Sequence, residues 1–137
     1  MTNKTVVLAL DVGEKRIGVA LADSVIKIAI PLQTIDVDGT EIDQINQILG
    51  AESADIIVVG YPRNQSGEVT AQTEYVEEFA KKLVELGKKI DFQDESLTSV
   101  AAEQRLKAYG GKYEKGDIDS MAASIILQDY MEQNYAR

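Results

Sequence analysis

Three apolar runs open the chain, separated by short polar turns. Residues 5–11 (TVVLALD) stay apolar until Asp11, which predicts a central strand covered on both faces. Residues 16–22 (RIGVALA) predict a second strand, and the turn between the two is too short for anything but an antiparallel hairpin. Residues 25–31 alternate (VIKIAI) before Pro31 and predict a third strand. The opening residues therefore predict a three-stranded antiparallel meander.

Helices and short apolar strands alternate in the remainder of the chain. Strands are predicted at 56–60 (IIVVG) and 89–93 (KIDFQ), and helices at 42–49, 68–86, 99–109 and 117–134. The order βββαβαβαα predicts an α/β fold, a mixed five-stranded sheet with helices on both faces. This is the arrangement of the ribonuclease H-like fold, and residues 1–137 are expected to form one domain of it.

The amino-acid composition excludes several kinds of catalytic and metal site. The chain has 137 residues with no cysteine and no histidine, which excludes thiolate sites, the commonest general base and a His-based serine triad. Carboxylates, Lys, Tyr, hydroxyls or a metal held by oxygen ligands remain. No cleavable N-terminal segment and no run long enough to span a bilayer is found, so a cytoplasmic location is expected.

The net charge of −9 argues against a protein that simply coats nucleic acid. The acidic residues are unevenly placed, because residues 31–60 carry six acids and no base, whereas residues 1–30 carry four Lys or Arg and three acids. An acidic protein can still act on a phosphate backbone where divalent metal neutralises the acids at the site.

Three acids fall at positions predicted to be inward. Asp11 ends the central strand, and Glu95 follows the 89–93 strand at its C-terminal end, where sites in open α/β sheets gather. Asp119 heads an apolar stripe of the last helix, whereas Asp117 heads a polar stripe (Ser120, Ser124, Gln128) and is expected to be a helix N-cap facing solvent. Taken singly, each acid is explained by a cap or a buried ion pair. Together, Asp11, Glu95 and Asp119 predict an oxygen-ligand site for Mg²⁺ or Mn²⁺, with Asp94 as a minor alternate ligand.

Four motifs, in this order and spacing, carry a family resemblance over almost the entire chain: LDVGEKRIGVALAD (10–23), VVGYPRNQSGEVTAQT (58–73), DESLTSVAAEQRL (94–106) and KGDIDSMAASIILQDYM (115–131). The sequence resembles the YqgF/RuvX family of Holliday junction resolvases, also described as pre-16S rRNA nucleases. The resemblance implies a ribonuclease H-like nuclease whose catalytic and metal-binding acids correspond to Asp11, Glu95 and Asp119. It also favours a role in phosphate binding for Lys15 and Arg16 over that of a solvated turn.

The chain departs from the family pattern at two places. Ser96 follows Glu95 where the family usually has Arg, and the loop after residues 56–60 reads Tyr-Pro-Arg-Asn where Leu-Pro-Leu-Asn is common. Arg63 and Asn64 are therefore expected to supply the nucleic-acid contact, in a loop that precedes a helix N-terminus.

Two rival functions are considered. The stretch DVGEKRIGVAL is similar to the first phosphate loop of sugar and acetate kinases, but those enzymes bind ATP between two domains and 137 residues leave room for one. A non-catalytic nucleic-acid-binding or scaffold module of the same fold is the second rival, and the presence of all three acids favours the nuclease. The expected partner is structured RNA or branched DNA, and the expected state is a monomer or weak homodimer.

Overall fold

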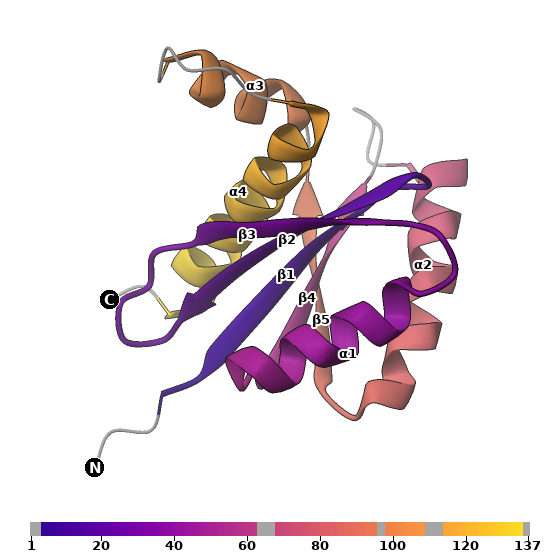
Figure 1. The fold of residues 1–137 in the computed structure, drawn as a ribbon. Helices are drawn as coiled ribbons and strands as arrows, with labels where there is room; N and C mark the ends of the chain where they lie inside the picture. The colour runs from indigo at the N-terminus through magenta and orange to yellow at the C-terminus, as the bar shows by residue number, and fades with distance from the viewer. Residues whose placement is uncertain (1–3, 63–67, 96–97, 109–113, 136–137) are drawn as a thin grey trace.

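The sheet has five strands in the order β3-β2-β1-β4-β5. A computed structural model describes residues 4–62, 68–95, 98–108 and 114–135 (Figure 1). The strands are β1 (Val6–Val12), β2 (Arg16–Asp23), β3 (Ile30–Asp36), β4 (Ile56–Pro62) and β5 (Lys89–Glu95). β2 pairs antiparallel with both β1 and β3, whereas β4 is parallel to β1 and to β5. The predicted meander and mixed sheet are confirmed.

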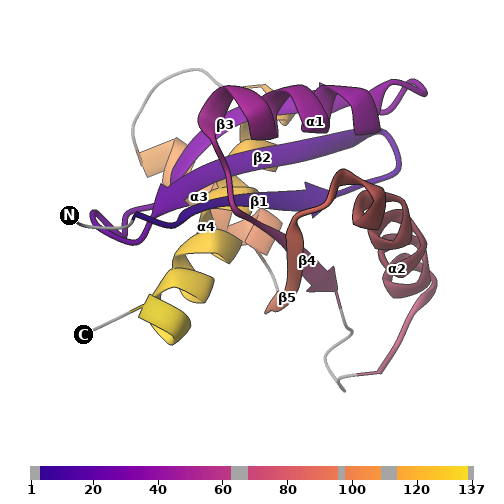
Figure 2. The same ribbon diagram turned by 90° about the horizontal axis from the view of Figure 1, so that it is seen from below.

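Helices cover both faces of this sheet. They are α1 (Glu41–Glu52), α2 (Ala71–Leu83) with a short 3₁₀ turn η1 (Val84–Leu86), α3 (Thr98–Ala108) and α4 (Lys115–Tyr135). Figure 2 shows α1 and α4 on opposite sides of the sheet, and α3 packs on α4 through Ala102, Ala122 and Ile125. None of the described helices is long and apolar enough to cross a membrane.

Alternation along β1 divides the core into two layers. Val6, Leu8 and Leu10 pack toward α1 and α2, whereas Val7 and Ala9 pack toward α4. The same period places Asp11 on the α4 side of the sheet, one step beyond Ala9. An otherwise buried strand thus presents a carboxylate toward α4.

The third strand was predicted at 25–31, and this is wrong because β3 begins only at Ile30. The Asp23 side chain accepts two backbone N–H bonds from the residues that follow it, which closes a turn. Lys27 has a positive φ of 66°, which interrupts any extended strand. Gln128 of α4 holds this segment by donating to the Lys27 carbonyl and accepting from the Ala29 N–H.

Helix boundaries differ from the prediction by a few residues. The helix predicted from 68 begins at Ala71, because Thr70 and Thr73 form a capping box there. The last helix begins at Lys115, so Asp117 lies inside its first turn and its carboxylate accepts the N–H of Glu114. The prediction of Asp117 as the N-cap is therefore wrong, although its exposure is as predicted.

The polar stripe of α4 was predicted to face solvent, and beyond Asp117 this is wrong. Ser120 and Ser124 are buried, and Gln128 is half-buried. α4 lies between the sheet and α3, so most of its circumference is covered. The serine hydroxyls are satisfied within the helix by bonding to carbonyls three residues earlier. A polar stripe was therefore compatible with burial.

Candidate functional site

Asp11 and Asp119 approach each other where α4 lies against the hairpin of β1 and β2. Gly18 stands opposite Asp11 in the β1–β2 register. A Cβ added at Gly18 would lie 1.9 Å from the backbone oxygen of Asp119. The absence of a side chain at this position therefore lets the N-terminal part of α4 lie directly on β2, and this contact brings Asp119 to the end of β1.

The electrostatics of Asp11 reflect this closeness. Burial raises the pKa of Asp11 from 3.8 to about 6, and the negative charge of Asp119 contributes in the same direction. Two carboxylates that repel each other in a poorly solvated place are stabilised by a bound cation. The pair has the donor chemistry that Mg²⁺ and Mn²⁺ prefer, namely carboxylate oxygen.

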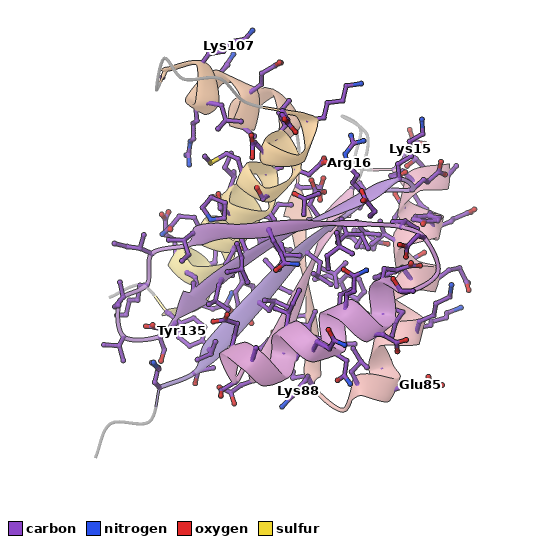
Figure 3. The ribbon with its side chains drawn as sticks, in the orientation of Figure 1. Lys15, Arg16, Glu85, Lys88, Lys107 and Tyr135 are labelled. Carbon is purple, nitrogen blue, oxygen red and sulfur yellow. The ribbon has the colours of Figure 1, made fainter. Side chains whose placement is uncertain are left out.

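Arg16 supplies a positive charge to the same pair. Its Nε donates to Oδ2 of Asp119 at 2.6 Å, and the two side chains are 34% and 24% exposed. Within the described part of the chain, the guanidinium makes this hydrogen bond through Nε. Lys15 next to it is exposed, and Figure 3 shows both side chains at the β1–β2 turn. Arg16 therefore binds an acid of the site, besides the phosphate role expected for it.

Glu95 reaches the α4 side of the sheet from the end of β5. It is paired with Pro62 of β4, and its Oε2 would lie 2.1 Å from a Cβ added at Gly60. Gly60 follows Val59, which is level with Leu10 of β1, so Gly60 is the β4 position level with Asp11. The Glu95 carboxylate thus lies over the strand that separates β5 from Asp11.

A tyrosine of α4 bonds to β5 on this face. The Tyr130 hydroxyl donates to Oδ2 of Asp91 at 2.5 Å, and burial with this bond raises the Tyr130 pKa above its usual range. The bond sets the position of α4, which carries Asp119, relative to the strand that carries Glu95.

Asp11, Glu95 and Asp119 do not form a complete set of metal ligands in this structure. Among the residues that the structure describes, no three acidic side chains lie close enough to hold one metal ion. Asp11 and Asp119 are brought together, and Glu95 lies over the adjacent strand. Asp94 points to the opposite face of the sheet, where it lines a hollow with Tyr61, Glu77 and Phe92. This orientation argues against Asp94 as the alternate metal ligand considered from the sequence.

The remaining predicted contacts fall outside the described residues. Arg63, Asn64 and Ser96 belong to the ranges 63–67 and 96–97, so their expected roles stay predictions. Two glycines shape the site: Gly18 accommodates the N-terminal part of α4, and Gly60 leaves room for the Glu95 carboxylate. Sequence reasoning missed the role of Gly60. The available signal was a glycine ending an otherwise β-branched buried run.

Comparison with known proteins identifies the family to which the chain is similar. The model of the RuvX family, described as Holliday junction resolvase, matches residues 5–133. A protein of Chloroflexus aurantiacus named "Putative pre-16S rRNA nuclease" is 46% identical over 135 residues, covering 95% of this chain and 88% of that protein. A Synechocystis protein of the same name is 40% identical over 137 residues, with 96% and 90% covered.

Solved structures support the fold. RuvC of T. thermophilus, in complex with Holliday junction substrate, aligns with a TM-score of 0.57 at 15% identity, covering 94% of this chain and 95% of that one. Fowlpox virus resolvase, in complex with Holliday junction DNA, aligns with a TM-score of 0.54 at 13% identity, covering 94% and 98%. The chain therefore belongs to the RuvX family of Holliday junction resolvases, a family of nucleases.

Proposed function

We propose that this chain is a metal-dependent nuclease that hydrolyses phosphodiester bonds in structured nucleic acid, with the 5′ region of precursor 16S rRNA as its substrate. The observation that carries the proposal is the pair formed by Asp11 and Asp119, two carboxylates brought together at the end of a buried strand. A partly buried pair of carboxylates that repel each other is costly for folding, and such pairs are typical of functional sites.

The residues divide the chemistry between them. Asp11 and Asp119 would hold a divalent ion, and Glu95 would complete the ligand set from the β5 side. Bound in pairs, such ions activate a water and stabilise the leaving oxygen of a phosphodiester. Since the chain has no histidine, a carboxylate would be the group that accepts the proton of the attacking water. Arg16 orients Asp119 through Nε, which leaves its terminal nitrogens to approach a phosphate.

Charge placement is compatible with a polyanionic substrate. The acid-rich segment 31–60 includes α1, which lies on the face of the sheet opposite α4 (Figure 2). Lys15 and Arg16 lie at the end where the acid pair is (Figure 3). A nucleic acid that approaches this end of the sheet would meet Lys15 and Arg16, although α4 itself carries four acids and one lysine.

The RNA substrate is preferred because the curated relatives with 36–46% identity are named for it. A cytoplasmic site of action follows from that substrate, and one copy of the chain suffices for it. A four-way DNA junction is the second candidate, favoured by the description of the family model. Symmetric junction cleavage would require two paired sites, and hence a homodimer.

The test is Mn²⁺-dependent cleavage of a precursor 16S rRNA fragment and of a four-way DNA junction by the wild type, Asp11→Asn and Asp43→Asn. Asp43 is exposed on α1, so its change is the matched control. We expect cleavage of the RNA by the wild type and the control, and loss of at least about 100-fold in Asp11→Asn. Nucleic-acid binding without cleavage of either substrate would favour the non-catalytic module instead.

A further inference from the structure

Gly60 is a buried glycine whose backbone conformation does not require glycine. It lies within β4, and the described glycines with positive φ are Gly39 and Gly87. Glycine weakens a strand interior, because it packs no side chain and loses the most freedom on folding. The reason for glycine at position 60 must therefore be the space it leaves.

That space is occupied by the Glu95 carboxylate. A Cβ at Gly60 would meet Oε2 of Glu95 at 2.1 Å, its Cδ at 3.3 Å and Cδ1 of Ile126 at 2.8 Å. All of these atoms belong to side chains, and the two nearest are the far ends of flexible ones. An alanine could therefore fit if the carboxylate and the methyl group rotated away, with no movement of the backbone.

Two other glycines provide contrast. At Gly18 the added Cβ would meet backbone atoms of Asp119 and Ser120, and these cannot move without shifting α4. At Gly50, in α1, it would meet nothing within 4 Å. The same chemical change thus tests a side-chain contact at Gly60, a backbone contact at Gly18 and open space at Gly50.

We propose that Gly60 is a positioning residue that seats the Glu95 carboxylate over β4, level with Asp11, so that Glu95 can join Asp11 and Asp119 as a metal ligand. Without this gap, a side chain on β4 would separate the β5 acid from the β1 acid. The proposal rests on the proposed function, because it assigns Glu95 to the same metal site.

Gly60→Ala should displace the carboxylate while preserving the fold. Moving Oε2 from 2.1 Å to ordinary van der Waals separation requires roughly 1.5 Å of displacement. A displacement of this size can lower a catalysed rate by about 100-fold. The disturbance of a group that orients a metal ligand typically weakens metal affinity by about 10–100-fold.

The experiment measures Mn²⁺ binding directly, from the electron paramagnetic resonance signal of free Mn²⁺ during titration. The proteins are the full chain as wild type, Gly60→Ala, Gly50→Ala, Glu95→Ala, the double variant Gly60→Ala/Glu95→Ala, and Asp11→Asn. Melting temperatures in EDTA report folding. We expect Gly60→Ala to bind Mn²⁺ at least about tenfold more weakly, Gly50→Ala to match the wild type, and the double variant to bind as Glu95→Ala does.

The other possible results of these measurements either overturn or support the role proposed for Gly60. Wild-type Mn²⁺ affinity in Gly60→Ala, or an equal further loss when Gly60→Ala is added to Glu95→Ala, would overturn the proposal. Unfolding of Gly60→Ala alone, relieved in the double variant, would support a clash with Glu95, whereas unfolding of both would overturn it. Unaltered Mn²⁺ binding in Asp11→Asn would instead contradict the proposed metal site, and this separates the two failures.

Discussion

Replacing Asp11 by Asn should make the metal-free protein more stable at neutral pH. Burial and the nearby Asp119 charge raise the Asp11 pKa from 3.8 to about 6, so ionising Asp11 costs more in the folded chain than in the unfolded one. A shift of about two pKa units corresponds to about 3 kcal/mol of unfolding free energy at most. Asn has the same shape and carries no charge.

The effect has a defined pH window. Below about pH 4 Asp11 is protonated in both states, so its contribution to stability does not change with pH. Between about pH 4 and 6 the folded state retains a proton that the unfolded state has lost, and the wild type loses stability as pH rises. The difference between Asp11→Asn and the wild type should therefore grow over this interval and level off above it.

Urea unfolding in EDTA at one-unit steps from pH 4 to 8 measures this difference. At pH 7 the gain should be about 1–3 kcal/mol, which corresponds to a rise in melting temperature of roughly 3–12 °C for a domain of this size. Asp43→Asn, on the exposed surface of α1, should change stability by less than about 0.5 kcal/mol at every pH. An Asp11→Asn variant no more stable than the wild type at pH 7, or a gain independent of pH, would refute the reasoning.

Three further outcomes are expected. Gly18→Ala should destabilise the fold by more than about 3 kcal/mol, because its Cβ would overlap the Asp119 backbone; a midpoint in urea equal to that of the wild type would contradict the packing described. Gln128→Ala should cost about 1–2 kcal/mol and speed amide hydrogen exchange in the segment between β2 and β3, which it bridges. Arg16→Ala should reduce the slope of log binding constant against log salt concentration for RNA by about one unit, whereas Lys107→Ala on α3 (Figure 3) should leave this slope unchanged. A reduced slope in Lys107→Ala but not in Arg16→Ala would place the phosphate contact on α3.

The sequence was most informative where a strand is covered on both faces. The runs that became β1, β2 and β4 are largely apolar and buried, so their pattern agrees with their interior positions in the sheet. The proximity of Asp11 and Asp119 also followed from pattern, because an acid at the head of an apolar helical stripe must face the sheet.

Prediction failed where a tertiary contact overrides a local pattern. The alternation at 25–31 resembles a strand, yet Val25, Ile26 and Ile28 are 56%, 66% and 62% exposed in a turn segment. Its conformation depends on Gln128, about one hundred positions later. The contact between Gly60 and Glu95 could not be predicted either, because it depends on the register between β4 and β5, which no local sequence pattern encodes.

The distance along the chain between the parts of the site has a consequence for protein synthesis. Arg16 and Asp119, which are hydrogen-bonded to each other, are separated by 103 positions. The N-terminal part of α4 must lie on Gly18 before Asp11 and Asp119 meet. A chain emerging from the ribosome at about 5–20 residues per second can form the β1–β2 hairpin seconds before α4 exists. During that interval the growing polypeptide has Asp11 without its counterpart, so a ribosome-bound fragment ending before α4 lacks the acid pair.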